Sequence, residues 1–293
     1  MSKIIAFQIP KSQKEFIRFQ QDRGSFFYDK LHQHPQLQLT VILAGRGQFL
    51  SGDYMGRFEP GDVFFLGENV PHVFRSDEEY FEENSGLEIA GDTLFFDFQA
   101  MGNSFWEVED LAALRKFHAM KGACYQLQGA TLTKIKQLFE EVQGASGLFR
   151  FQKGMEMLAE LEAGMGELVA LNQTEGLIGL KEKDGSRMDQ ILRFILENKS
   201  RAFSLDEVAG VAHMSKEAFC RFFKLRTRKT FTQYVNQLRI SDAQKLLQET
   251  EWNISEIAFK VGYENLSHFN RNFKSIVGKT PMEFRKGFVL EAD

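Results

Sequence analysis

The chain has 293 residues with 36 basic and 40 acidic side chains, and its formal net charge at pH 7 is −4. A length near 300 favours two domains of ordinary size, and 43% hydrophobic with 26% charged residues excludes a disordered chain. Cys124 and Cys220 stand far apart, which excludes a disulfide scaffold and a cysteine-rich zinc cluster. No apolar run reaches the ~18–20 residues of a membrane helix, and the N-terminal residues do not resemble a signal peptide. We therefore expect a cytoplasmic protein without a membrane partner.

The N-terminal part of the chain has the pattern of short strands separated by turns. A β-rich run at 37–43 ends at a glycine-containing turn at 44–47, and the turn 51–53 separates two further short strands. A turn at 59–62 precedes the strand 63–66, and residues 92–98 form another strand candidate. Strands that alternate with turns at this spacing predict an antiparallel sandwich or small barrel.

Helical periodicity follows the strands. Leu, Phe and Met recur at three- and four-residue steps over 108–120, 131–142 and 148–171, which predicts three helices. The last two helices each carry an apolar stripe, which either packs against the barrel or forms a dimer interface. The stripes are Leu132, Ile135, Leu138, Phe139 and Val142, and Leu148, Phe149, Phe151, Met155, Leu158, Leu161, Met165, Leu168 and Leu171. His118 has no partner that the sequence identifies.

The charge is unevenly distributed between the two ends of the chain. Residues 187–293 hold 18 basic and 13 acidic side chains, a net of +5, which leaves −9 for residues 1–186. Between them, the segment 172–186 contains three glycines and no apolar periodicity, and we place a linker at 174–186. Charge asymmetry of this kind predicts two domains with different partners.

The basic domain contains an ordered internal repeat. LDEVA at 205–209 matches ISEIA at 254–258, and FCRFFK at 219–224 matches FNRNFK at 269–274. Each copy predicts two helices joined by a tight turn, with Ser204 able to cap the first copy and either Asn253 or Ser255 the second. The copies at 204–225 and 254–276 therefore have the helix-turn-helix pattern, in which the second helix enters the major groove of DNA.

A single uninterrupted helix is predicted between the two copies. Residues 230–250 contain neither Gly nor Pro and carry apolar residues at helical steps. About 20 residues at ~1.5 Å each give a rod of ~30 Å, close to the ~34 Å of one DNA turn. Such a helix could present both recognition helices to one face of the duplex.

The basic domain resembles the AraC/XylS family of bacterial transcription regulators. The resemblance rests on LRISDAQKLL at 238–247, ISEIAFKVGY at 254–263, FNRNFK at 269–274 and GKTPMEFR at 278–285, about a third of the chain. The resemblance implies contacts to base edges from both second helices. The implied base-facing residues are Glu217, Cys220, Arg221, Leu266, Ser267, His268, Asn270 and Arg271.

The chemistry of these side chains differs. Arg221 and Arg271 recur at equivalent positions, and arginine can form two hydrogen bonds to guanine. Glu217 could accept from a cytosine amine or repel phosphate, and a redox role for Cys220 is a remote alternative. A further set of basic residues suits phosphate contacts, which position the protein without specifying sequence. These are Lys216, Lys224, Arg226, Arg228, Lys229, Lys274 and Lys279.

The N-terminal part resembles a cupin, a small double-stranded β-helix barrel with a central pocket. The residues that carry this resemblance are HQHPQLQ at 32–38, PGD at 60–62 and GENVPH at 67–72. In metal-binding cupins the matching positions hold two histidines, a glutamate and a third histidine; here they are His32, His34, Gln38 and His72. Because an amide is a weaker ligand than a carboxylate, we expect no metal or other cofactor, with the three histidines as weak candidates.

The barrel instead suits a small organic effector. The candidate pocket residues are His32, His34, Gln38, His72, Phe64 and Phe74. Aromatic residues at 26–28 could line the same pocket, although aromatics at strand spacing also form cores. The acidic run 77–83 is either a solvated loop or a site for a cationic effector.

The sequence thus predicts an α+β protein. We expect a cupin-like sensor at 1–128, a helical dimerisation segment at 129–173, the linker, and an all-α DNA-binding domain at 187–293. The expected function is a DNA-binding transcription regulator controlled by a small-molecule effector. Its expected partners are double-stranded DNA, a second copy of the chain and, for an activator, RNA polymerase. The alternatives are a regulator with a purely structural barrel and a metal-dependent cupin enzyme fused to a DNA-binding domain. No catalytic motif supports an enzyme.

Overall fold

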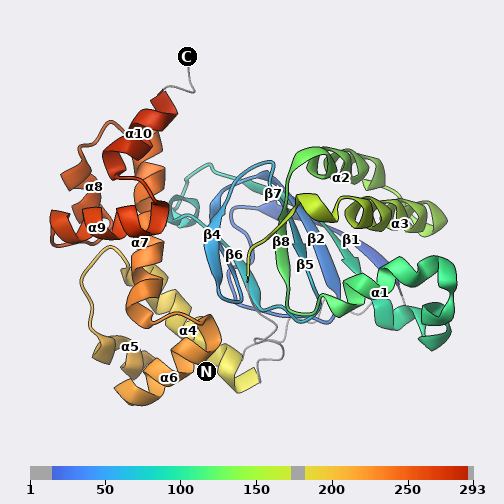
Figure 1. Ribbon diagram of the computed structural model, residues 1–293, viewed down its shortest axis with the longest axis horizontal. Coiled ribbons are helices and arrows are strands. Elements are labelled where there is room, and N and C mark those ends of the chain that lie inside the picture. The colour runs from blue at the N-terminus through green and yellow to red at the C-terminus, as the bar shows by residue number, and fades with distance from the viewer. Residues whose placement is uncertain (1–14, 173–181, 290–293) are drawn as a thin grey trace. The chain divides into compact units, whose positions relative to one another are not determined.

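The computed structural model describes residues 15–172 and 182–289 (Figure 1). The chain divides into two compact units between residues 185 and 186, and each unit is described by itself. The N-terminal unit combines antiparallel sheets with helices, and the C-terminal unit is helical, which confirms the predicted α+β class. In the described parts of the chain, no helix is both long and apolar enough to cross a membrane.

Two antiparallel sheets form the centre of the N-terminal unit. The larger has the strand order β1-β7-β2-β5-β8-β9, and the smaller has the order β4-β3-β6. The strands are β1 (Ile17–Gly24), β2 (Leu37–Ala44), β3 (Gly47–Ser51), β4 (Tyr54–Phe58), β5 (Val63–Leu66), β6 (His72–Ser76), β7 (Ile89–Phe96), β8 (Cys124–Leu127) and β9 (Leu168–Ala170). The sequence pattern predicts the strands of the central hairpins but not β1, β6, β8 and β9.

Alternation along β2 assigns its side chains to two different cores. Leu37, Leu39 and Val41 pack with helices on one face of the larger sheet. Gln38 and Thr40 point to the opposite face, where they line a cavity. The face toward the smaller sheet is otherwise filled by aromatic and aliphatic side chains. That second core contains Phe27, Ile42, Phe49, Phe58, Phe64, Leu66, Val70, Phe74, Tyr80, Ile89 and Cys124.

Three α-helices accompany the larger sheet: α1 (Ala112–Ala119), α2 (Gly129–Val142) and α3 (Gly147–Ala163). In Figure 1, α2 and α3 lie side by side along the sheet, and the apolar stripes of both helices join its core. The predicted helix over 148–171 is wrong beyond Ala163, because a short 3₁₀ turn and strand β9 follow. Gly164 and Gly166 interrupt the helix at that point. A Cβ on Gly164 would also meet Thr131 Oγ1 at 1.8 Å, so glycine is required there.

The C-terminal unit contains seven helices in its described part. They are α4 (Glu182–Asn198), α5 (Leu205–Val211), α6 (Lys216–Thr227), α7 (Phe231–Glu249), α8 (Ile254–Lys260), α9 (Leu266–Val277) and α10 (Pro281–Val289). Helix α4 begins inside the segment that the sequence assigned to the linker. The rest of that linker, 174–181, lies outside the described residues.

Polar caps fix where the helices of the repeat begin. Ser204 and Glu207 form a capping box on α5, and Thr230 caps α7 with Gln233 in the same way. Asn253 is the cap of α8: its Oδ1 accepts from Glu256 N at 2.9 Å, while Ser255 Oγ donates to that same oxygen at 2.6 Å. The sequence did not decide whether Asn253 or Ser255 caps α8, and the structure shows that the cap is Asn253.

Candidate functional site

The second helix of each helix-turn-helix copy carries a polar face that its own unit leaves uncovered. On α6, Phe219 and Phe223 are fully buried, and on α9 Phe269 and Phe273 are equally buried. Their burial turns the opposite face of each helix to solvent. All eight base-facing candidates are exposed: Glu217, Cys220, Arg221, Leu266, Ser267, His268, Asn270 and Arg271.

The two arginines on these helices are available for DNA. Among residues 182–289, no hydrogen bond or ion pair engages the guanidinium of Arg221 or Arg271. Glu217 differs, because it lies in the first turn of α6 beside its cap Ser215. Hydrogen bonds from its own backbone N–H and from Ser215 hold the pKa of this carboxyl below its ordinary value. A carboxylate there complements the helix N-terminus, so its position is explained without a base contact.

The phosphate candidates divide by exposure. Lys216, Lys224, Arg228, Lys274 and Lys279 are exposed, whereas Arg226 and Lys229 are half-buried. The Arg226 guanidinium lies over the Phe222 ring at 5.6 Å, and Lys229 Nζ donates to Gln237 Oε1 at 2.7 Å. Lys216 Nζ pairs with Asp206 Oδ2 at 2.7 Å. The exposed lysines therefore suit phosphate contacts better than the two half-buried cations.

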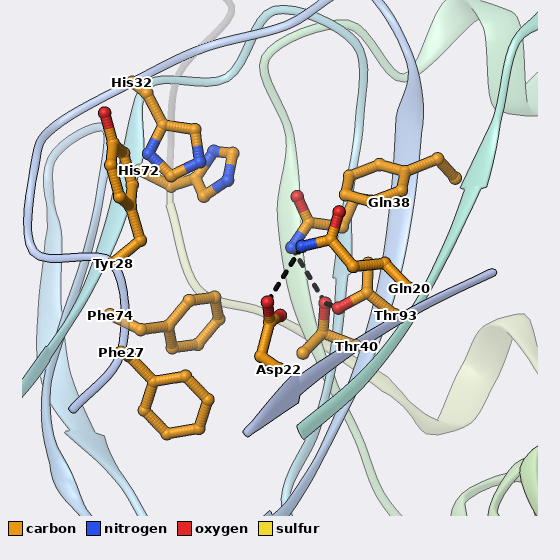
Figure 2. Close-up of a pocket in the computed structure, with 11 residues that line it drawn as sticks. Gln20, Asp22, Phe27, Tyr28, His32, Gln38, Thr40, His72, Phe74 and Thr93 are labelled. Atoms are coloured by element: carbon orange, nitrogen blue, oxygen red, sulfur yellow. Dashed lines mark hydrogen bonds between the residues drawn. The ribbon is translucent and has the colours of Figure 1, made fainter. Parts of the chain in front are cut away.

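A cavity of about 60 Å³ lies inside the N-terminal unit, between its two sheets (Figure 2). The larger sheet supplies polar side chains from β1, β2 and β7, and β6 of the smaller sheet supplies His72 and Phe74. The segment between β1 and β2 supplies Phe27, Tyr28 and His32. The full lining is Gln20, Asp22, Phe27, Tyr28, His32, Gln38, Thr40, His72, Phe74, Thr93 and Phe95.

The structure brings four of the six predicted pocket residues to this cavity, namely His32, Gln38, His72 and Phe74. Phe64 is fully buried in the aromatic core behind Phe74 and does not line the cavity. His34 lies behind Gln38, with its Nε2 at 2.8 Å from Gln38 Oε1. Gln38 Nε2 donates to Thr40 Oγ1 at 2.8 Å, and the Thr40 and Thr93 hydroxyls lie 2.9 Å apart.

Gln20, Asp22, Thr40, Thr93 and Phe95 line the cavity but were not predicted to do so. Two of them belong to β1, a strand with so many polar residues that its pattern does not stand out. Thr40 could have been found from alternation alone, because it follows Gln38 by two residues on the same strand face.

Three histidines meet at one end of the cavity. Their nearest ring nitrogens lie within 4.8 Å of one another, and residues 32 and 72 form a backbone bridge between the two segments. The Nδ1 atoms of His32 and His72 lie 2.8 Å from Lys30 O and 2.9 Å from Val70 O. Because a carbonyl only accepts, each Nδ1 carries a proton and each Nε2 presents a lone pair. His72 Nε2 is buried and has no hydrogen-bond partner.

Burial keeps these imidazoles uncharged. It lowers the pKa of His32 to about 4, and it also lowers those of His34 and His72. Neutral imidazole is the form that binds metals. The unpartnered Nε2 of His72, with the His32 ring beside it, suits a divalent transition metal such as zinc, and the Gln38 amide stands where metal-binding cupins have a carboxylate. Both ring nitrogens of His34 lie against oxygens, Nδ1 at 3.0 Å from Gln36 O and Nε2 at 2.8 Å from Gln38 Oε1, so His34 would bind a metal only after the Gln38 amide turned away.

Two family models match separate parts of the chain. An AraC-like ligand binding domain matches residues 14–89, and a helix-turn-helix domain matches residues 208–287. The uncharacterized HTH-type transcriptional regulator YdeC of Bacillus subtilis (strain 168) is 24% identical, over 88% of this chain and 87% of that protein. The transcriptional activator RhaR of Enterobacter sp. (strain 638) is 23% identical, over 87% and 86%. This chain belongs to the AraC family of DNA-binding transcription regulators.

Further comparisons with this AraC-family regulator cover one or both units. The Msm operon regulatory protein of Streptococcus mutans serotype c (strain ATCC 700610 / UA159) is 22% identical over 90% of this chain and 88% of that protein. ToxT from Vibrio cholerae O395 gives a TM-score of 0.36 at 14% identity, over 92% of this chain and 97% of that chain. The DNA-binding domain of AdpA, solved with a target DNA, gives 0.34 at 24% identity, over 34% and 91%. YdeC, RhaR and the Msm operon protein are regulators by name, not enzymes.

Arg239 of this AraC-family regulator joins parts of the DNA-binding unit that the sequence did not connect. From α7, its Nε donates to Lys199 O and its Nη2 to Arg201 O, both at 2.8 Å. The same guanidinium lies over the rings of Phe203 and Tyr263, at 5.9 and 5.6 Å. Arg239 therefore links the loop before α5 to the turn of the second helix-turn-helix.

His118 of the regulator does have a partner. Its Nδ1 lies 2.8 Å from Oε1 of Glu68, a buried carboxylate that Lys121 Nζ also approaches at 4.0 Å. Glu68 belongs to the GENVPH segment that leads into His72, so α1 is tied to the segment that precedes this cavity residue. A partner fifty positions away in the chain gives no local signal in a single sequence.

Proposed function

We propose that this AraC-family regulator binds DNA under the control of a small molecule held in the cavity of its N-terminal unit. The observation that carries the proposal is the buried, unpartnered Nε2 of His72 at the wall of that cavity. A buried polar atom without a partner is costly, and a ligand would supply the missing hydrogen bond. The match of residues 14–89 to an AraC-like ligand binding domain supports the same reading.

On DNA, each second helix would enter the major groove. Arg221 and Arg271 would contact base edges, together with the exposed residues around them, and the exposed lysines would contact phosphates. The 19 residues of α7 span ~29 Å at ~1.5 Å each. That length supports two recognition helices placed about one DNA turn apart.

The regulator is further proposed to act as a homodimer. The stripes on α2 and α3 predicted to form a dimer interface are largely buried in the chain's own core, so they are not available to a partner. Leu148 and Phe149, in the first turn of α3, remain 81% and 52% exposed and are the proposed contact. Because its partner is DNA, we place the regulator in the bacterial cytoplasm on the nucleoid. RNA polymerase is a further partner if it activates transcription.

The test is a ligand screen on the full chain. A panel of small sugars, acids and amines is added, and the melting temperature and the gel shift with operator DNA are measured. The control is Thr40→Val, which removes a cavity hydroxyl. We expect at least one compound to raise the melting temperature and change DNA affinity in the parent but not in Thr40→Val. A panel without any effect would favour a purely structural barrel.

Metal sensing is a second candidate function, favoured by three histidine rings that each bring a nitrogen within 4.8 Å of the other two. Zn²⁺ or Ni²⁺ would be titrated into the chelator-treated full chain by calorimetry. One metal per chain is expected, with binding lost in His72→Gln and retained in His118→Gln, whose ring pairs with Glu68 instead. Absence of stoichiometric binding in the parent would remove this candidate.

A further inference from the structure

Two hydrogen-bond acceptors of the cavity have no protein donor in the described parts of the chain: the buried His72 Nε2 and the half-buried Asp22 Oδ2. Gln20 Nε2 already donates to Asp22 Oδ1 at 2.9 Å, and Gln38 Nε2 already donates to Thr40. Within the described residues, nothing donates to Asp22 Oδ2, and His72 Nε2 likewise lacks a donor. A ligand that completes this cavity therefore has to bring N–H or O–H groups.

Asp22 also brings a negative charge that no direct ion pair balances in the described part of the chain. Its neighbour Arg23 turns to other acceptors: Nη2 pairs with Asp92 Oδ1 at 2.7 Å, and Nη1 donates to Gly91 O at 2.7 Å. Within the described residues, Asp22 forms no ion pair, and no Lys or Arg lines the cavity. Burial raises the pKa of Asp22, and the hydrogen bond from Gln20 and the positive charge of Arg23 oppose this shift without cancelling it.

The wall opposite Asp22 is aromatic. Figure 2 shows the rings of Phe27 and Phe74 across the cavity from Asp22 and Thr40. Ring faces attract cations through their quadrupole, most strongly where water is excluded. A carboxylate or phosphate ligand would meet Asp22 and these rings without any cationic partner, so the lining disfavours anions.

The size of the cavity limits the ligand. Each water needs roughly 10–15 Å³ of this kind of volume, so the 60 Å³ available correspond to a ligand of only a few heavy atoms. A large sugar or aromatic effector would require the lining to move.

We propose that the cavity binds a small organic ammonium ion. Its N–H groups donate hydrogen bonds to Asp22 and His72, and its positive charge lies against the rings of Phe27 and Phe74. The inference rests on effector control as proposed above and names the chemical class of that effector. A neutral hydroxyl compound of the same shape would bind more weakly, because it lacks the charge that Asp22 and the rings recognise.

The test compares charged and neutral compounds of matched shape on the full chain, with a metal chelator present. Ethanolamine and propylamine are titrated against ethylene glycol and propanol, and binding is followed by calorimetry and melting temperature. We expect the two amines to bind at least about tenfold tighter than their neutral partners, the range of a charged hydrogen bond.

Two substitutions locate the charge recognition. Asp22→Asn keeps the acceptor for Gln20 but removes the charge, and is expected to weaken amine binding at least about tenfold and to affect the neutral compounds much less. Asp110→Asn is the control, because this exposed carboxylate lies in the turn before α1 and does not line the cavity. Phe74→Leu provides a second variant that keeps the carboxylate and removes one ring.

The outcomes separate the two proposals. Binding of the neutral compounds alone, or amine binding that Asp22→Asn leaves unchanged, would overturn the ammonium inference and leave effector control standing. Amine binding weakened equally by Asp110→Asn would also overturn it. If none of the four compounds binds while another compound of the broader screen does, only the ammonium inference fails. If no compound of either screen binds, both proposals fail.

Discussion

Asp22 occupies a position where a carboxylate destabilises the ligand-free chain. Burial raises its pKa above the ordinary 3.8, so the folded state holds this proton to a higher pH than the unfolded state. Between pH 3.8 and the raised pKa, unfolding therefore releases a proton. The destabilisation by the buried carboxylate is fully present above the raised pKa and absent below pH 3.8. Asp22→Asn should therefore raise the free energy of unfolding at pH 7, with a gain that shrinks as the pH falls toward 3.8.

Urea unfolding of the full chain at several pH values measures this effect. Asp92→Asn is the matched comparison, since its carboxylate is paired with Arg23 at 2.7 Å and its loss should destabilise the chain. A decrease in stability for Asp22→Asn at pH 7 would show that the carboxylate is stabilised by partners other than Gln20. A stabilising substitution that abolishes ligand response is the expected behaviour of a binding residue.

Individual site residues were predictable to different degrees. His32, Gln38 and His72 stand in recognisable motifs, and the structure does bring them to one cavity. Phe64 belongs to the same strand pattern, but its side chain points into the aromatic core one layer behind the cavity. Asp22 was missed because it lies on β1, whose alternation is obscured by polar residues on both faces. Which strand forms the edge of the larger sheet depends on long-range pairing, here β1 with β7, that a local pattern does not encode.

At the scale of elements, the turns of both helix-turn-helix copies contain a residue with a left-handed backbone, but the residue type differs between the copies. The turn of the first copy holds His213 at a φ of 52°, and the turn of the second holds Gly262 at 94°. Left-handed backbone favours glycine. In the second copy there is also no room for a side chain, because a Cβ on Gly262 would meet Lys199 O at 2.4 Å.

Gly262→Ala should therefore destabilise the DNA-binding unit by about 1–3 kcal/mol and disturb the Arg239 contacts beside it. The control is Gly210→Ala on α5, where a Cβ meets nothing within 4 Å and alanine should stabilise by about 0.5–1 kcal/mol. Thermal unfolding of both variants of the full chain measures the difference. If Gly262→Ala and Gly210→Ala had equal melting temperatures, the close approach of the new Cβ to Lys199 O would be relieved by a small backbone shift.

The start of α8 offers a second test at the same scale. Asn253→Ala removes the acceptor for Glu256 N and should cost about 1 kcal/mol. Ser255→Ala is the control, since its hydroxyl only donates to Asn253 Oδ1, and a much smaller loss is expected. A larger loss for Ser255→Ala, measured by chemical denaturation, would reassign the cap.

Periodicity located most helices because their buried faces repeat locally, as for α7 with its capping residue Thr230. It failed at the end of α3, where Leu168 continues an apolar spacing but belongs to β9. That strand exists because Leu168 and Val169 pair with Leu127 and Gln126, residues some forty positions earlier. The two glycines before it carry the local signal, and they outweigh the spacing of the apolar residues.

At the scale of the whole molecule, the net charge of −4 is the sum of an acidic and a basic part of the chain. The last 107 residues carry +5 while the remainder carries −9, so the DNA-binding unit is attractive to phosphate although the protein as a whole is acidic. Electrostatic attraction to DNA is sequence-independent and weakens with salt, whereas base contacts discriminate between sequences. The two contributions should therefore respond to different substitutions in the full chain.

Lys224→Ala should weaken binding to all DNA sequences and reduce the slope of log affinity against log salt by about 1, the effect of one lost phosphate contact. Arg271→Ala should instead reduce the preference for the operator over random DNA by ~10-fold, since a bidentate guanine contact is worth ~1–3 kcal/mol. The operator comes from genomic footprinting, and both variants are measured at several salt concentrations. Lys134→Ala, in the acidic unit, is the control and should change neither quantity. If Arg271→Ala lowered affinity for operator and random DNA alike, this arginine would contact phosphate, and sequence reading would rest on Arg221 and the other exposed residues of the two second helices.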